Sequence, residues 1–377
     1  MIKIKNSAVF YVLFITLFTL LSLEITARYY LSNVLQKSSN RKFRFNYHRV
    51  YEHVPNFREG DGIKDWIVIN SNGFRRQENV KKEKSADTYR VFILGGSTAH
   101  GMSSVRPYPI RHIYPDETID AYMEADLRKI KKKVEIINAA VAAYQVYNHT
   151  QYLMTEILDY SPDLVIFFDG ANDHYINNPN FNYISDNRYQ FWKSRLQEPS
   201  IKGLFDYSAY YMANYSGLFR GYFSRKLQKD ALSNNKKINS NVSYKNDTEL
   251  IEDYKLSSKK GYLRSIRMNL DLLKSEGIDA IIALQPLLVL RDPNLLSKEE
   301  RSFLHQDVEK TKLNPYVVND LKSLASSYGI SFIDYNPIFN DPKYKGKQLY
   351  IDYVHFTPLG GKVAADSLTK LVLNRID

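Results

Sequence analysis

The chain has 377 residues, no cysteine and a formal net charge of +11 at pH 7. The absence of cysteine excludes disulfide bonds, thiolate metal sites and a cysteine nucleophile. The basic residues are scattered along the chain without a familiar nucleic-acid-binding motif, so we interpret them as a solvated basic surface and expect no nucleic-acid partner.

The first element is an uncharged apolar run, NSAVFYVLFITLFTLLSL, at residues 6–23. Extended to Ala27 past Glu24, this run reaches the length of about 20 mostly apolar residues that a membrane-spanning helix needs. A cleaved signal peptide needs small residues around an A-x-A-like site, and the sequence SLEITARYY fits that pattern poorly. We therefore predict that residues 1–27 form an uncleaved, single-pass N-terminal membrane anchor.

The flanking charges do not settle the orientation of this anchor. Two lysines precede the apolar run and five basic residues follow it: Lys3 and Lys5, then Arg28, Lys37, Arg41, Lys42 and Arg44. By the positive-inside rule this count directs the bulk of the chain inward. Most of the following charges lie at least ten residues beyond the run, however, and we expect the domain after the anchor to be extracytoplasmic.

Residues 28–88 are interpreted as a juxtamembrane lead-in and linker. The segment INSNGFRRQE (69–78) contains Asn72-Gly73, a pair that favours a turn with positive φ. The next ten residues, NVKKEKSADT, are mostly polar.

From residue 89 onward, short apolar strands alternate with helices. The predicted strands are 89–96, 134–138, 161–170, 279–286 and 330–336, and the predicted helices are 118–133, 147–160 and 357–373. This alternation predicts an α/β fold, with a mainly parallel sheet covered by helices on both faces. In the last helix, Thr357 is expected as the N-cap and Pro358 at the first helical position.

An insertion is predicted at residues 174–260, between the third and fourth strands. An ordinary connection in an α/β domain is far shorter. The insertion is rich in Tyr and Asn, which suggests either a substrate-binding cap whose tyrosines stack on sugar rings or a segment packed on itself.

Four loops follow the predicted strands and are expected to meet, because sites in open parallel sheets form beyond the carboxyl ends of the strands. These loops are residues 95–98, 138–144, 170–173 and 352–355. Each polar residue in them has an ordinary structural explanation when taken alone, such as a turn, an Asx turn, a cap or a surface histidine. The glycines of GGSTAHG lack the spacing of phosphate-binding and dinucleotide-binding loops.

Together the four loops indicate nucleophilic catalysis. Ser97 lies on a strand-to-helix turn, where its hydroxyl can protrude and the backbone N–H groups can bind an oxyanion. His355 can act as the general base for Ser97, and Asp352 can orient the imidazole. Asn172 offers an amide donor to the oxyanion. The remaining histidines have no metal-like spacing, and we expect neither a metal nor an organic cofactor.

The blocks GGST, NAAVAAY, GAND and DYVHFTPLG resemble those of the SGNH (GDSL-like) hydrolase superfamily over residues 89–377. The segment INSNGFRR is similar to one in membrane-anchored bacterial members. The resemblance implies a three-layer α/β/α sandwich with a flavodoxin-like five-stranded sheet. It also implies the catalytic residues Ser97, Asp352 and His355, and an oxyanion hole formed by Ser97, Ala143 and Asn172.

The sequence departs from the family pattern at two positions. The first block reads Gly-Gly-Ser instead of Gly-Asp-Ser, which leaves the serine in place. Ala143 stands where the family usually has glycine. Alanine keeps the backbone N–H at that position but is strained there if the loop needs a positive φ.

These features predict a membrane-anchored serine esterase that hydrolyses O-acyl esters, including O-acetyl esters, on glycans or lipids. Two alternatives stay open at this point. One is an O-acyltransferase that acts on cell-surface glycans with the same residues. The other is a non-catalytic glycan-binding protein on a degenerate SGNH scaffold.

Overall fold

The computed structural model describes residues 6–29, 42–46, 48–104, 108–130, 133–173, 212, 216–218, 246–304 and 308–376. The chain separates into two compact units. One comprises Met1–Val50 with Ser185–Asn241, and the other comprises Tyr51–Ile184 with Val242–Asp377. Most of the predicted insertion, residues 174–211, 213–215 and 219–245, lies outside the described residues.

The first unit contains the apolar helix α1, Asn6–Tyr29, followed by the short strand β1, Phe43–Asn46. The stretch Val9–Tyr29 of α1 has a mean hydropathy of 2.1, so its length and composition suffice to cross a membrane. The carboxylate of Glu24 accepts hydrogen bonds from the Ser216 hydroxyl (2.7 Å) and the Gly217 N–H (2.7 Å). A charge inside an apolar helix is costly unless it has such partners.

The second unit is built on a five-stranded, all-parallel sheet with the order β6-β5-β7-β8-β9. The strands are β5 (Tyr89–Gly95), β6 (Val134–Asn138), β7 (Leu164–Asp169), β8 (Asp279–Leu284) and β9 (Ser331–Asp334). Counted in chain order the arrangement is 2-1-3-4-5, which is the flavodoxin-like order. The predicted fold class is therefore confirmed, and all five predicted strands lie at the predicted positions.

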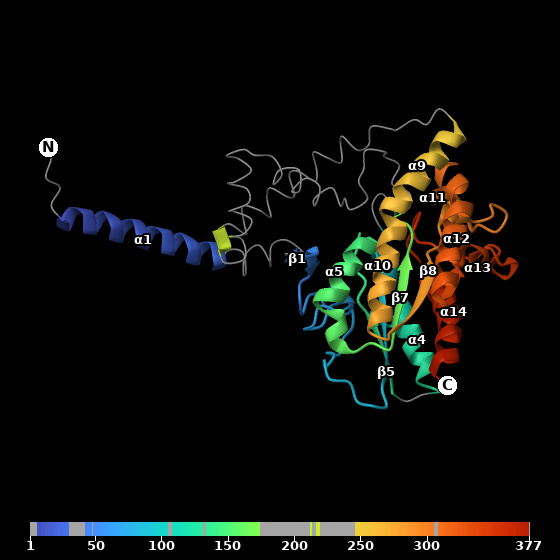
Figure 1. Ribbon diagram of the computed structural model, residues 1–377, viewed down its shortest axis with the longest axis horizontal. Coiled ribbons are helices and arrows are strands. Elements are labelled where there is room, and N and C mark those ends of the chain that lie inside the picture. The colour runs from blue at the N-terminus through green and yellow to red at the C-terminus, as the bar shows by residue number, and fades with distance from the viewer. Residues whose placement is uncertain are drawn as a thin grey trace. The chain divides into compact units, whose positions relative to one another are not determined.

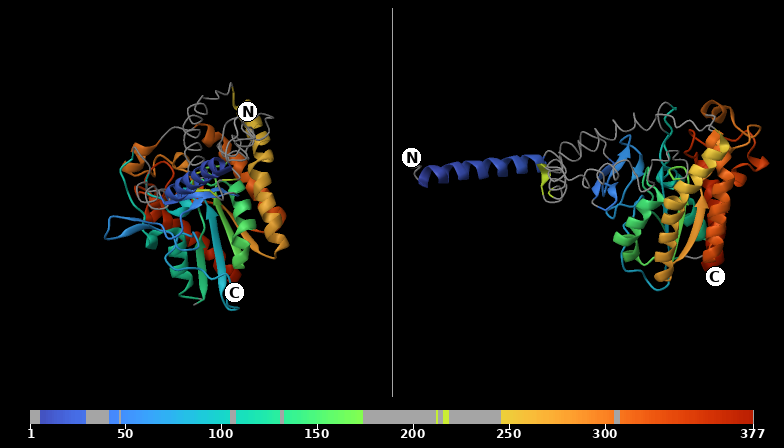
Figure 2. Two further views of the ribbon diagram at one scale, coloured as in Figure 1. Left: turned by 90° about the vertical axis from the view of Figure 1, so that its left-hand side faces the viewer. Right: turned by 45° about the horizontal axis from the view of Figure 1, so that its top comes forward.

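Helices cover both faces of this sheet (Figures 1 and 2). On one face α4 (Ile119–Leu127) packs against α14 (Pro358–Ile376), and on the other α5 (Val146–Thr155) packs against α10 (Tyr262–Ser275). The helix α12 (Val308–Tyr328) contacts α10 and strands β8 and β9. The left view of Figure 2 shows the sheet between the α4–α14 pair and the α5–α10 pair.

Short elements complete this unit. They are β2 (Val50–His53), β3 (Arg58–Gly60), β4 (Asp65–Val68), α3 (Ser97–His100), η2 (Pro115–Glu117), η3 (Ile157–Tyr160), α9 (Asp247–Lys260), η4 (Leu288–Leu290), α11 (Lys298–Phe303), α13 (Tyr335–Phe339) and η5 (Pro342–Tyr344). Strands β3 and β4 form an antiparallel pair. The helix α9 lies within the predicted insertion, and its Tyr254 hydroxyl bonds Asp320 of α12 at 3.0 Å.

The central strands are apolar on both faces because both faces are covered. All six residues of β7 are buried. Alternate residues of the strands belong to the core on the α4–α14 side, namely Val91, Ile93, Leu164, Ile166, Phe168, Ile281 and Ala283. The residues between them are buried towards the other side, where the Phe167 ring contacts His149 of α5. Each fully buried aliphatic or phenyl side chain contributes roughly 1.5–3 kcal/mol to folding.

Two helices are shorter than predicted. The helix over 118–133 ends at Leu127, before the run of lysines, because lysines on successive turns of a continued helix would repel one another. The helix over 147–160 breaks at Glu156, where φ is −153°, and continues as η3. Leu153 and Ile157 are buried, whereas Met154 is 63% exposed, so Met154 does not contribute to the core.

The predicted N-cap of the last helix is confirmed. The Gly360 N–H donates to the Thr357 hydroxyl at 3.1 Å, and Pro358 is the first helical residue. The hydroxyl of Thr357 itself donates to the Gln348 carbonyl at 2.9 Å. This cap fixes the start of α14 directly after the loop that carries Asp352 and His355.

Within the second unit, Arg75 joins the segment before the sheet to the loops that follow β5. This side chain is buried, and its guanidinium donates to the carbonyls of His100 (2.5 Å), Trp66 (2.9 Å) and Ile113 (3.2 Å). Burial lowers the pKa of Arg75 to about 10, against the opposing effect of Asp120. The carbonyl of His100 is the last of α3, so this arginine ties the segment to the short helix that begins at Ser97.

A second buried arginine, Arg291, forms an ion pair with Glu300 of α11. One guanidinium nitrogen lies 2.5 Å from each carboxylate oxygen, and both side chains are at most 1% exposed. The carboxylate also accepts the N–H groups of Leu349 (2.8 Å) and Tyr350 (3.1 Å) and, through the capping box of α11, that of Ser297 (2.9 Å). One carboxylate therefore holds three segments together.

The substitution Glu300→Ala is expected to lower the free energy of unfolding by about 3–5 kcal/mol, because it leaves the Arg291 guanidinium buried without its partner. The matched control is Glu299→Ala, which removes the neighbouring exposed carboxylate of the same helix and should change stability by no more than about 0.5 kcal/mol. Urea-induced unfolding measures both. Equal free energies of unfolding for the two variants would contradict the stabilising role of the Glu300 carboxylate.

Candidate active site

The site begins at the end of β5, where two glycines lead into α3 and Ser97 is the first helical residue. A Cβ atom at Gly95 would lie 2.5 Å from the Phe168 carbonyl oxygen. One at Gly96 would lie 2.5 Å from the Asn172 side-chain nitrogen. Both distances are too short for a side chain, so the glycines allow β7 and its loop to approach Ser97 closely.

Asp352 and His355 form a directly bonded pair in the loop before α14. The His355 Nδ1 lies 2.7 Å from Asp352 Oδ2, and both side chains are buried. The other carboxylate oxygen accepts the N–H groups of Val354 and His355, each at 2.8 Å. Burial raises the pKa of Asp352, but the hydrogen bond and electrostatic attraction of His355 and the two N–H groups outweigh it and hold this pKa below its usual value. The carboxylate is therefore ionised at neutral pH.

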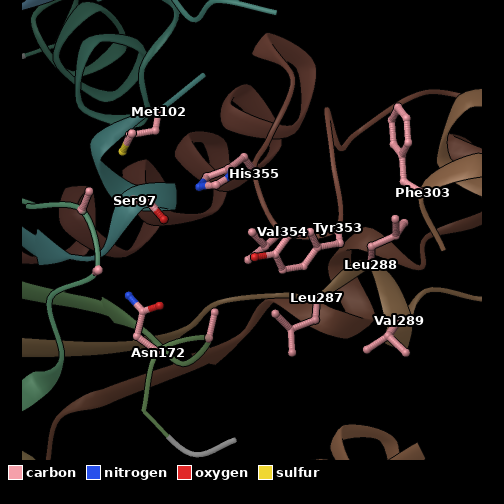
Figure 3. Close-up of a pocket in the computed structure, with 13 residues that line it drawn as sticks. Ser97, Met102, Asn172, Leu287, Leu288, Val289, Phe303, Tyr353, Val354 and His355 are labelled. Atoms are coloured by element: carbon pink, nitrogen blue, oxygen red, sulfur yellow. The ribbon is translucent and has the colours of Figure 1, made fainter. Parts of the chain in front are cut away.

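The bond to Asp352 fixes the tautomer of His355. A carboxylate only accepts, so Nδ1 carries the hydrogen and Nε2 has the lone pair in the neutral ring. Nε2 is buried and has no hydrogen-bond partner within the described part of the chain. Figure 3 shows the imidazole and the Ser97 hydroxyl turned toward one another. This arrangement allows His355 to accept a proton from Ser97.

Asn172 faces the same space from the loop after β7 (Figure 3). Its side-chain nitrogen donates one hydrogen to the Tyr144 carbonyl at 2.9 Å, and an amide nitrogen has a second hydrogen to donate. The loops after β6 and β7 are bonded to one another twice more, through Gln145 Nε2 to the Asn172 carbonyl (2.7 Å) and the Val146 N–H to Asp173 (2.9 Å). These bonds join the two loops into one body.

Ala143 has a φ of +60°. The loop after β6 therefore needs a left-handed residue at this position, and alanine adopts that conformation at a cost of roughly 1–2 kcal/mol. The backbone N–H of Ala143 is retained, and the residue lines the same cavity as Ser97. The sequence could not tell whether this loop needs a positive φ at Ala143. The structure shows that it does, so the alanine is strained.

These residues surround a cavity of about 340 Å³. It brings together Ser97, Ala143, Asn172 and His355 of the predicted site, and Asp352 lies behind His355. The rest of the lining is mainly apolar and comprises Met102, Ala142, Ala171, Leu287, Leu288, Val289, Phe303, Tyr353 and Val354. Sequence reasoning missed Leu287, Leu288, Val289 and Phe303, because single apolar residues outside the strands carry no mark of a binding site.

Two other buried histidines, His100 and His149, are not among the residues that line this cavity. His100, the histidine nearest to Ser97 in sequence, is buried, and its ring lies tilted by 50° against the ring of His53, with 4.9 Å between the centroids. His149 is buried and bonds Asp169 at 3.0 Å. Across the residues that the structure describes, no group of three or more His, Asp or Glu side chains is placed to hold a metal ion.

Several solved structures are similar to this chain. A GDSL-like lipase from Bacteroides thetaiotaomicron is 13% identical, with a TM-score of 0.38 and coverage of 79% of this chain and 91% of the lipase. An acetylxylan esterase from Geobacillus stearothermophilus is 13% identical, with a TM-score of 0.41 and coverage of 78% and 96%. A lipase/acylhydrolase from Enterococcus faecalis is 13% identical, with a TM-score of 0.38 and coverage of 76% and 97%. No protein-family model and no curated protein sequence matches the chain.

Replacement of Ala143 by glycine tests the strained conformation. The substitution Ala143→Gly relieves the left-handed alanine but adds the entropy that glycine loses on folding, and the net expectation is a gain of about 0.5–1 kcal/mol in the free energy of unfolding. The neighbouring Ala142→Gly is the matched control, since Ala142 is not among the positive-φ residues, and it should lose about 0.5–1 kcal/mol. Thermal unfolding measures the stability of both variants. A lower free energy of unfolding for Ala143→Gly would contradict the strain at this position.

Proposed function

We propose that the protein is a serine esterase that hydrolyses O-acyl esters through Ser97, His355 and Asp352. The observation that supports this most strongly is the pairing of His355 with a buried, ionised Asp352, which leaves the basic nitrogen of the imidazole unpartnered and turned toward the Ser97 hydroxyl. A serine alcohol becomes an effective nucleophile only with such an oriented base.

In the first half of the reaction, the Ser97 oxygen attacks the ester carbonyl carbon while its proton passes to Nε2 of His355. The carbonyl π bond opens and its electron pair becomes the oxyanion of a tetrahedral intermediate. When the intermediate collapses, the bond to the alcohol oxygen breaks and the His355 imidazolium returns the proton to that oxygen. The products of this half are the free alcohol and an acyl-enzyme on Ser97.

Three donors are proposed to stabilise the oxyanion. They are the backbone N–H groups of Ser97 and Ala143 and the second amide hydrogen of Asn172, and all three residues line the cavity. A side-chain donor in this role typically contributes about 3 kcal/mol to the barrier reduction. The Gly96 backbone leaves the space in which Asn172 can sit close to Ser97.

In the second half, a water molecule attacks the acyl-enzyme carbonyl and gives its proton to His355. The collapse of the second tetrahedral intermediate releases the carboxylic acid, and His355 returns the proton to the Ser97 oxygen. Asp352 stays ionised throughout, because it bonds the imidazolium more strongly than the neutral ring. The enzyme is regenerated with one ester and one water consumed.

Hydrolysis of 4-nitrophenyl acetate tests these roles. We expect Ser97→Ala and His355→Ala to lower kcat/KM by at least about 1,000-fold, and Asp352→Asn by up to about 10,000-fold, because each removes one part of a unit that acts together. Ser103→Ala is the matched control, since it removes a nearby hydroxyl that bonds His112 and should retain the wild-type rate. Equal rates in wild type and Ser97→Ala would refute the nucleophile.

A fluorophosphonate probe provides a second readout. It should label the wild-type protein and not Ser97→Ala, because it reacts with the activated serine oxygen. Absence of labelling in the wild type would favour a non-catalytic protein on the same scaffold.

We further propose that α1 is a single-pass anchor and that the esterase domain is extracytoplasmic. The chain has no cysteine, so a single introduced cysteine reports its own side of the membrane. Ile63 is 96% exposed, and Ile63→Cys is expected to react with a membrane-impermeant maleimide in intact cells. Wild type is the control, and labelling that occurs only after permeabilisation would place the domain on the cytoplasmic side.

A further inference from the structure

The cavity has a polar end and an apolar end. The polar end holds Ser97, Asn172 and His355. Figure 3 shows Leu288, Val289 and Phe303 on the side of the cavity away from Ser97, with Leu287 and Tyr353 between the two ends. The apolar end is therefore continuous with the space in which an ester carbonyl would meet the nucleophile.

The side chains at the apolar end suit methylene groups rather than sugar hydroxyls. Among the described lining residues none is a Lys, Arg, Asp or Glu, and the hydroxyl of Tyr353 is the one side-chain hydrogen-bonding group away from the polar end. A sugar ring placed there would lose the hydrogen bonds that its hydroxyls make with water and would find few replacements, which is unfavourable for each unsatisfied group. An aliphatic chain has no such cost and gains by leaving water.

The apolar wall is held open by the fold. The Leu287 N–H donates to the Asn336 side chain at 3.2 Å, and the Arg291 N–H donates to the Leu288 carbonyl at 3.0 Å. The Arg291–Glu300 ion pair then fixes the end of η4 to α11, which carries Phe303 at its last position. A wall fixed in this way forms a binding site before the ligand arrives.

We propose that the apolar end binds an unbranched aliphatic chain of the ester substrate. This inference rests on the proposed esterase function. The cavity of about 340 Å³ lies within the range of about 300–1,000 Å³ that small-molecule sites have. The ester group itself takes part of this volume, and an acetyl group alone would leave most of the cavity unfilled.

The chain belongs either to the acyl half or to the alcohol half of the ester, and two substrate series distinguish them. The first is 4-nitrophenyl acetate, butyrate, hexanoate and octanoate. The second is methyl, butyl, hexyl and octyl acetate, followed by acid release. In one series kcat/KM should rise by about 4-fold for each added methylene, because each buried methylene contributes about 0.8 kcal/mol. The series in which kcat/KM rises identifies the half of the ester that the apolar end binds. If kcat/KM rises in neither series, the proposal is wrong.

A variant that fills the apolar end provides the matched test. Val289→Trp is expected to lower the ratio of kcat/KM for the eight-carbon ester to that for the acetate by at least about 10-fold, since Val289 lines the cavity and the larger ring occupies the place of the chain. Ile130→Trp adds the same ring at a side chain that is 65% exposed and lies outside the cavity lining. It should leave the ratio unchanged. An unchanged ratio in Val289→Trp would contradict the proposal.

A binding measurement separates this proposal from the esterase function. Calorimetric titration of full-length Ser97→Ala with sodium octanoate should give a Kd at least about 100-fold lower than sodium acetate gives, because the longer chain buries six further methylenes. If no ester is hydrolysed but octanoate binds in this way, the esterase function fails and the chain site stands. If wild type hydrolyses 4-nitrophenyl acetate but sodium octanoate binds to Ser97→Ala no better than sodium acetate does, the proposed chain site is wrong and the esterase function stands.

Discussion

The buried carboxylate of Glu300 sets the geometry of two walls of the cavity. It accepts hydrogen bonds from the guanidinium of Arg291, the backbone of Ser297 and the N–H groups of Leu349 and Tyr350. A carboxylate removed from water is costly unless its lone pairs are satisfied, and here four partners satisfy them. The segment with the apolar wall and the segment that leads into Asp352 therefore cannot shift independently.

The parallel sheet supplies the other half of the site. Because all five strands run in one direction, the loops after β5, β6 and β7 meet at one edge, where Ser97, Ala143 and Asn172 line one cavity. The strands were predictable because each is a short apolar run between polar turns, and burial on both faces is what such runs need. The bend at Glu156 and the exposure of Met154 could not be predicted, because they depend on how α5 packs on the sheet.

The polar residues of the cavity were predictable because each follows a strand or precedes the last helix, at positions where side chains of loops converge. The conformation of Ala143 was not, since φ in a loop is set by the tertiary bonds around it. The apolar wall of the cavity could not be predicted from the sequence either. The pattern Ser297-x-x-Glu300 is a capping box that marks the start of a helix, but it does not indicate that Phe303 lines the same cavity as Ser97.

The three hydrogen bonds between the loops after β6 and β7 have a consequence for how fast the protein can work. Asn172 donates to the Tyr144 carbonyl and accepts from the Gln145 side chain, and Glu300 fixes the opposite wall. Within the described residues the polar groups of the cavity are thus held in place before a ligand binds, and under the proposed function little reorganisation is left for the substrate to induce. Turnover limited by bond making and breaking, rather than by closure of these loops, would be insensitive to the viscosity of the solvent.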